Sequence, residues 1–105
     1  LMGLGHEEYY VSEPHEVPEG ARDSNITWTA DVPDKTWVKA QLRFADTPDN
    51  LDSAGWSGPD GTGNTWFENG DQPILEGRWV QYQLALGALN SLGTPRVTEV
   101  AIKFS

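Results

Sequence analysis

The chain of 105 residues has no cysteine, so neither disulfide bonds nor thiolate metal ligands contribute to its stability. Basic residues are also scarce: 7 Lys and Arg stand against 16 Asp and Glu, which gives a formal net charge of −9. Nucleic acids and anionic membranes are bound through clustered basic side chains, so neither is expected as a partner. The acidity is instead typical of a soluble chain, of a calcium site or of a neutral ligand.

Long apolar runs and helical periodicity are missing as well. No apolar run approaches the length of a membrane span, and no stretch keeps a period of 3.6 residues over several turns. Residues 1–6 lack the charged start and apolar centre of a signal peptide. We therefore expect a single domain over residues 1–105 that was excised from a larger protein. Within it, residues 1–23 are the less regular part and include a few leading residues added to the natural sequence.

Sequence signatures of catalysis are not found. The chain has no Gly-x-Ser-x-Gly elbow, no cysteine nucleophile, no phosphate-binding loop and no His-Glu-x-x-His motif. A glycosidase would need two carboxylates facing each other across a cleft, which so small a domain struggles to supply. We expect a protein that is not an enzyme.

Alternation of apolar and polar residues is the main structural signal, because successive side chains of a strand point to opposite faces. It predicts strands at residues 6–12, 24–32, 36–45, 78–86 and 94–104, with shorter ones at 65–67 and 73–75. A short connection rich in Gly and Asn joins the last two long strands, so we expect them to be antiparallel neighbours. Turns are expected at residues 33–35 and 69–71, where Pro, Asn, Asp and Gly cluster.

This pattern predicts an all-β protein, an antiparallel β-sandwich that is jelly-roll-like or, alternatively, immunoglobulin-like. Trp28 alternates with Ile26 and Ala30, so it is expected in the core. Residues 46–63 form a long loop, and loops of this length in small domains are often functional or anchored to the body. Within the loop, Trp56 is expected to fold back onto an end of the sandwich.

One face of two predicted strands carries side chains suited to sugar recognition. Trp can stack on the apolar face of a sugar ring, while amides and guanidinium groups hydrogen-bond its hydroxyls. Trp66 is a possible rim residue, and the alternative is an ordinary solvated sheet face. We call this set the polar sheet face; it consists of Trp37, Gln41, Arg43, Trp79, Gln81 and Gln83.

Several segments in a fixed order resemble a known family. They are Trp-Val-Lys-Ala-Gln-Leu-Arg-Phe-Ala at 37–45, Trp-Ser-Gly-Pro-Asp-Gly at 56–61, Gly-Arg-Trp-Val-Gln-Tyr-Gln at 77–83, and Thr-Pro at 94–95 followed by Val-Thr-Glu-Val-Ala-Ile. Over residues 24–104 the chain is similar to small β-sandwich modules of secreted, multi-modular bacterial proteins, which often accompany carbohydrate-active enzymes. The resemblance implies an extracellular or cell-surface accessory module, similar to carbohydrate-binding modules. Its partners would be a polysaccharide or glycan and the neighbouring domains of the parent chain.

The long loop is also a candidate for structural calcium, which takes six to eight oxygen ligands. Modules of the kind that the chain resembles often hold such an ion. The spacing lacks the pattern of an EF-hand loop, and the alternative is a solvated acidic loop. The candidate ligands are Asp46, Asp49, Asp52 and Asp60.

Two functions therefore remain open. The first is a non-catalytic carbohydrate-binding accessory module that binds sugar through the polar sheet face. The second is a structural spacer or protein–protein contact module with no sugar ligand. Burial distinguishes them: exposed Trp37 and Trp79 would favour the first, and covered ones the second.

Overall fold

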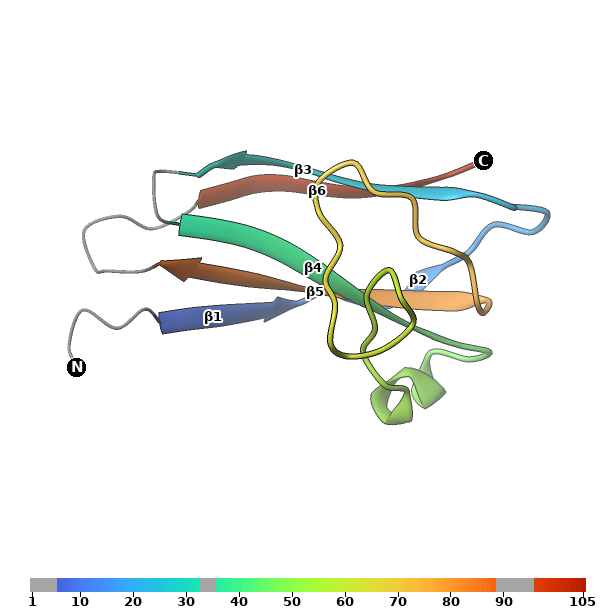
Figure 1. The fold of residues 1–105 in the computed structure, drawn as a ribbon. Coiled ribbons are helices and arrows are strands. Elements are labelled where there is room, and N and C mark those ends of the chain that lie inside the picture. The colour runs from blue at the N-terminus through green and yellow to red at the C-terminus, as the bar shows by residue number, and fades with distance from the viewer. Residues whose placement is uncertain (1–5, 33–35, 89–95) are drawn as a thin grey trace.

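Two antiparallel sheets form the body of the protein in a computed structural model, which describes residues 6–32, 36–88 and 96–105 (Figure 1). Within these ranges no helix is long and apolar enough to cross a membrane. The elements are β1 (His6–Val11), β2 (His15–Glu16), β3 (Ser24–Asp31), β4 (Thr36–Ala45), the 3₁₀ helix η1 (Asp49–Ser53), β5 (Trp79–Ala88) and β6 (Arg96–Phe104).

The larger sheet is built around β5. Strand β4 pairs with β5 along its whole length, from Thr36 opposite Ala88 to Ala45 opposite Trp79. Strands β1 and β2 share the other edge of β5. Strand β5 can serve as the centre because its alternation of apolar and polar residues lets one face pack on the core while both edges hydrogen-bond.

The smaller sheet consists of β3 and β6. Ile26 lies opposite Ile102 and Trp28 opposite Val100, so apolar side chains of both strands share the inner face. The register shifts between Thr29 and Ala30, which marks a β-bulge near the end of the pair.

The core lies between the two sheets, which gives a sandwich-like arrangement. Ile26 and Trp28 from the smaller sheet join a buried cluster with Leu42, Val80 and Leu84 from the larger sheet. Each such side chain contributes about 1.5–3 kcal/mol through removal of its apolar surface from water. For β3, β4, β5 and β6, the period-two prediction of which residues point inward, Trp28 included, is confirmed.

The predicted pairing of the last two strands is wrong. Strand β5 belongs to the larger sheet and β6 to the smaller one, where it pairs with β3. Both edges of β5 are already occupied, by β4 on one side and by β1 and β2 on the other. The alternation of apolar and polar residues specifies which face of a strand points to the core, but not which strand it pairs with. This explains the error. The expected turn at 33–35, the connection after β5 and the entry at 94–95 lie outside the described residues.

Two short predicted strands are also wrong. Residues 73–75 form no strand, and residues 65–67 contribute a single bridge in which Phe67 exchanges two backbone hydrogen bonds with Ala40. Pro73 has no N–H for a ladder, and the chain turns away after Phe67 at Gly70, whose φ is +94°. Strand β2 was not predicted, because its two residues stand among prolines.

The long connection between β4 and β5 closes one side of the sandwich (Figure 1). It is anchored first by Leu51 of η1, which is 1% exposed. Ser57 and Phe67 then bridge to the edge of β4 that faces away from β5. Further on, Gly70 and Asp71 exchange backbone hydrogen bonds with Ile26 of β3. The connection thus joins the edges of the two sheets and covers the core between them.

Candidate functional site

The polar sheet face does bring its amide and guanidinium groups together. The register places Gln41 opposite Gln83 and Arg43 opposite Gln81 on neighbouring strands. Trp37 and Trp79, by contrast, lie at opposite ends of the strand pair, because Trp79 is opposite Ala45. Eight residues of strand separate them, which is roughly 26 Å at about 3.3 Å per residue. The two rings therefore do not form one stacking platform.

Gln41 uses its side chain inside the protein. Its Nε2 donates to the carbonyl oxygens of Gly63 and Thr65, at 3.1 and 2.8 Å, and its Oε1 accepts from Gln83 Nε2 at 3.0 Å. The residue is 3% exposed. These bonds tie the long connection to β4, so the amide of Gln41 is already committed to the fold.

Gln81 has the same role on β5. Its Oε1 accepts from Arg43 Nε at 2.8 Å, and its Nε2 donates to the Ser12 carbonyl at 2.7 Å.

The Arg43 guanidinium also lies over the ring of Trp56, with its carbon 4.3 Å from the ring centroid. Trp56 therefore packs on Arg43 of the sheet, where a cation–π contact is favourable.

The remaining aromatic side chains make further contacts on this face. The Lys39 ammonium lies 4.5 Å from the centroid of the Trp66 ring, and Tyr9 stacks on the same ring at 6.4 Å. Trp37 lies against Gly87, where any Cβ atom would collide with the indole. Trp37, Trp66 and Trp79 are all half-buried. Residues 56–66 thus cover much of the β4 side of the polar sheet face.

The predicted calcium ligands do not form a cluster. In the described part of the chain, no group of three or more His, Asp or Glu side chains is placed to hold a metal ion. Asp52 instead approaches Arg43 at 3.5 Å. Calcium binding by the acidic loop stays a prediction from the sequence.

Asp60 organises the tip of the long connection. Its Oδ1 accepts hydrogen bonds from the Thr65 hydroxyl at 2.6 Å, the Thr62 hydroxyl at 2.7 Å and the Thr62 N–H at 2.8 Å. These hydrogen bonds lower the pKa of Asp60 below its ordinary value of 3.8 because they stabilise the carboxylate. The bond from Thr65 has the largest effect. At neutral pH, Asp60 is an ionised acceptor that holds the loop in shape.

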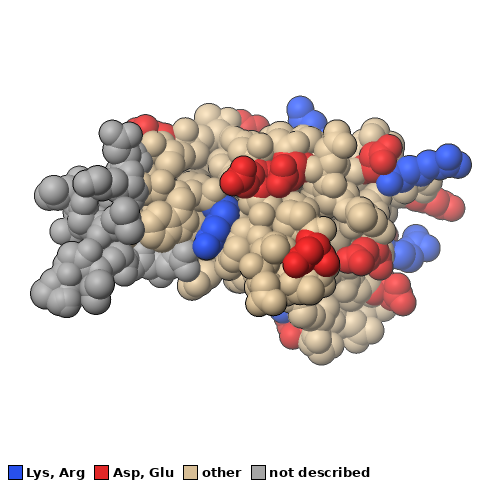
Figure 2. All heavy atoms as spheres, in the orientation of Figure 1, with Lys and Arg blue, Asp and Glu red and all other residues tan. Residues whose placement is uncertain are grey.

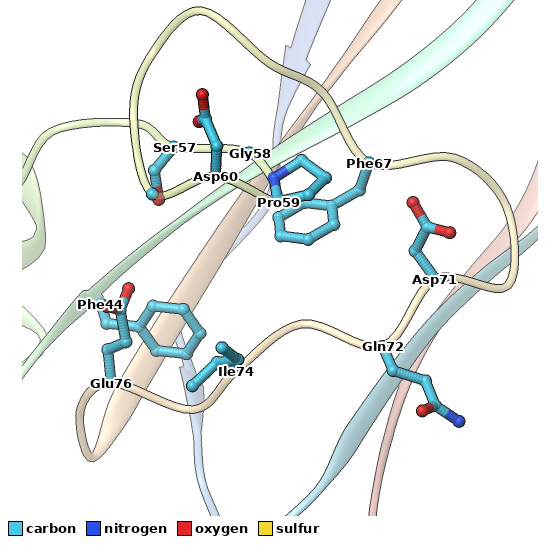
Figure 3. A pocket seen from close by; sticks show the side chains of 11 residues that line it. Phe44, Ser57, Gly58, Pro59, Asp60, Phe67, Asp71, Gln72, Ile74 and Glu76 are labelled. Carbon is cyan, nitrogen blue, oxygen red and sulfur yellow. The ribbon is translucent and has the colours of Figure 1, made fainter.

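A hollow with a volume of about 500 Å³ lies beside this tip, and we call it the loop hollow. Figure 3 shows the rings of Phe44, Pro59 and Phe67 and the aliphatic side chain of Ile74 around it. Ile74 is 78% exposed, which is unusual for so large an apolar side chain. The other lining residues are Ser57, Gly58, Asp60, Gly61, Asp71, Gln72 and Glu76.

Carboxylates surround the apolar part of the loop hollow. Asp71 and Glu76 lie at its sides, and the Asp60 side chain points away from its centre toward the loop tip (Figure 3). Asp71 Oδ2 accepts from the Glu68 N–H at 2.8 Å, which fixes its position. Figure 2 shows acidic side chains spread over the face that carries the long connection, with basic side chains among and beside them. The loop hollow is thus apolar inside and negative around its rim.

Sequence reasoning did not find this hollow. It is made by the end of β4 and three loop segments, which are distant in the chain and meet only in the fold. The alternation of residues 36–45 points Phe44 toward the core, and it does pack against the core cluster. Ile74 belongs to the predicted strand at 73–75, which the structure does not contain. No local pattern marks either residue as part of a surface hollow.

Comparisons of this chain with protein-family models, with curated proteins and with solved structures found no match. The resemblance to accessory modules of secreted proteins stays a prediction from the sequence.

Proposed function

We propose that the protein is a non-catalytic carbohydrate-binding module, and that its sugar lies in the loop hollow rather than on the polar sheet face. The observation that carries this proposal is the combination of apolar rings with a carboxylate rim in an open hollow. Its volume of about 500 Å³ is in the range of small-ligand sites, roughly 300–1,000 Å³.

The chemistry of the lining suits a sugar. A pyranose ring has apolar C–H faces, which pack on groups such as Phe44 and Ile74, and hydroxyls at its edge, which donate hydrogen bonds. The carboxylates of Asp71 and Glu76 are acceptors that such hydroxyls can reach from the hollow. A negative rim repels uronic acids and sulfated sugars, so the favoured ligand is a neutral or amino sugar.

The polar sheet face is less suited to this function. Gln41 and Gln81, at 3% and 8% exposed, already make hydrogen bonds within the protein. A ligand would have to break these bonds, and an unpaired buried amide costs about 1–3 kcal/mol. Residues 56–66 cover much of the β4 side of the polar sheet face. This cover favours the second candidate function, a structural spacer or protein-contact module of a secreted or cell-surface protein.

As part of a longer secreted protein, a sugar-binding module would act by proximity. Binding to a polysaccharide keeps a linked domain near its substrate, which raises the effective concentration of that domain without any change in its chemistry. This role requires no catalytic residues in the module itself.

The test is an affinity-gel and glycan-array screen against neutral, amino and acidic polysaccharides, with calcium and then with chelator. Ile74→Asn and Glu76→Gln change exposed residues of the loop hollow, and Val32→Asn and Glu13→Gln are matched controls at exposed positions elsewhere. We expect Ile74→Asn to weaken binding roughly tenfold, since about 1–2 kcal/mol of apolar contact is lost. The two controls should bind as the unchanged protein does.

Three other outcomes would each have a clear meaning. No binding across the panel would overturn the carbohydrate proposal and leave the contact module. Binding lost in Trp37→Ala or Trp79→Ala, but retained in Ile74→Asn, would move the site to the polar sheet face. Binding lost on addition of chelator would indicate that a metal ion takes part.

A further inference from the structure

The two strands of the smaller sheet differ in how well their inner faces are covered. Ile26 of β3 is fully buried, and its neighbour Trp28 is buried as well. Their partners across the ladder, Ile102 and Val100 of β6, point to the same core but stay half-exposed. The difference arises because the long connection covers the outer edge of β3, whereas no described segment pairs with the outer edge of β6.

At that edge, the described residues offer no hydrogen-bond partner to the backbone of β6. Trp28 and Ile26 direct their N–H and C=O groups to Asn69, Gly70 and Asp71, away from β6. In an antiparallel ladder, opposite residues either exchange both bonds or none, so Val100 and Ile102 point their backbone groups outward. Among the described residues, no hydrogen bond reaches these groups, and such an edge is a template for another strand.

Two hollows lie next to this edge. One of about 320 Å³ is lined by Tyr10, Tyr82, Leu84, Leu86 and residues 97–100 of β6. A second of similar size lies between His15, Glu16 and Tyr82 on one side and Val100 to Ile102 and Phe104 on the other. Tyr10 is 55% exposed, and burial raises the pKa of Tyr82, with Tyr10 adding to the effect. Apolar side chains therefore line part of the open side of the sandwich, together with His15 and Glu16.

We propose that the outer edge of β6 pairs with β6 of a second copy of this chain, antiparallel and with Ala101 on the two-fold axis. In this register Val100 of each copy faces Ile102 of the other, and both residues direct their free backbone groups to the shared edge. The two β3–β6 pairs then form one continuous four-stranded sheet, which removes two unpaired edges at once.

Charge selects this register from the alternatives. With Ala101 on the axis, Glu99 of each copy lies opposite Lys103 of the other on the outer face. Both are exposed, and they form non-hydrogen-bonded pairs, in which side chains come closest. If the two-fold axis passed through Val100 or Ile102, neither Glu99 nor Lys103 would face an opposite charge. If it passed through Glu99 or Lys103, that residue would face its own copy, a like charge. Because each chain carries a net charge of −9, local pairing of opposite charges offsets part of the repulsion between two copies.

This contact is independent of the proposed sugar site, since β3 lies between the outer edge of β6 and the segment that lines the loop hollow. It is tested with the full chain by sedimentation velocity from micromolar to millimolar concentration. The variants are Glu99→Lys, Lys103→Glu and the double swap Glu99→Lys with Lys103→Glu. All three change exposed side chains, and circular dichroism checks that each variant is folded.

We expect a concentration-dependent dimer for the unchanged chain. Each single reversal sets like charges opposite each other twice, so the dimer dissociation constant should rise at least roughly tenfold. The double swap restores both opposite-charge pairs and should restore the dimer. Amide hydrogen exchange at Val100 and Ile102 should slow as concentration rises.

A chain that is monomeric at every concentration would overturn the proposal and leave the edge to a strand of a different protein. A dimer that survives both single reversals would also overturn it, because the contact would then lie elsewhere. A dimer strengthened by the single reversals would overturn it as well, because Glu99 and Lys103 would then keep the copies apart.

Discussion

The side-chain amide of Asn69 hydrogen-bonds both backbone groups of Trp28. Its Nδ2 donates to the Trp28 carbonyl oxygen at 2.6 Å, and its Oδ1 accepts from the Trp28 N–H at 2.9 Å. One side chain thereby does what a paired strand residue would do. The edge of β3 is covered at Ile26 by backbone hydrogen bonds with Gly70 and Asp71. Asn69 extends this cover by two residues, to Trp28.

Replacement of Asn69 should therefore destabilise the protein. Asn69→Ala removes two hydrogen bonds and leaves the Trp28 backbone groups without these partners, so the free energy of unfolding should fall by about 1–2 kcal/mol. Urea denaturation followed by tryptophan fluorescence measures this change. Asn64→Ala is the matched control in the same connection, where the side chain is exposed and makes no described hydrogen bond. The control should stay within about 0.5 kcal/mol of the unchanged protein. Equal stability of the two variants would contradict the bridging role of Asn69.

Gln81 is expected to act in stability rather than in ligand binding. Gln81→Ala removes the acceptor of Arg43 Nε and the donor to the Ser12 carbonyl, and it leaves a buried gap. The free energy of unfolding should fall by about 2–3 kcal/mol. A double-mutant cycle with Arg43→Ala should show a coupling energy of about 0.5 kcal/mol or more, since the two residues share a hydrogen bond. An unchanged unfolding midpoint together with lost sugar binding would instead make Gln81 a ligand residue.

The pKa of Asp60 gives a prediction in acid. Its carboxylate is stabilised in the folded protein by the Thr65 and Thr62 hydroxyls and the Thr62 N–H, which lower its pKa. For a group with a lowered pKa, the stabilising effect is complete above the ordinary value of 3.8 and is lost as the pH falls through the lowered value. The loop tip should therefore keep its structure down to about pH 3.8 and loosen only in stronger acid.

The carboxyl carbon of Asp60 reports this titration by NMR. Thr65→Val removes the largest cause of the shift, so the pKa of Asp60 should move back toward its ordinary value. Asp60→Asn should abolish the acid transition of the neighbouring Thr62 amide. A midpoint at or above 3.8 in the unchanged protein would contradict the hydrogen-bond arrangement at the loop tip.

The polar sheet face shows how far local reasoning reaches. Alternation correctly put Gln41 and Arg43 on one face of a strand and Gln81 and Gln83 on one face of another, and the register made them neighbours. It could not tell that Gln41 would donate to the carbonyls of Gly63 and Thr65, because those residues are more than twenty positions away. Residue types suited to a ligand are equally suited to holding a loop, and only the three-dimensional contacts decide between the two uses.

The amino-acid sequence by itself determined that the protein is all-β, which residues of each long strand face the core, and that its surface is acidic. These properties follow from the alternating direction of side chains along a strand and from simple composition, both of which are local. Only the tertiary structure decided that β5 and β6 belong to different sheets, that the long connection covers one side of the sandwich, and that the loop hollow and the open edge of β6 exist. Strand partners and surface hollows depend on contacts between distant segments, whose free energies are set by the whole fold and not by any one stretch of chain.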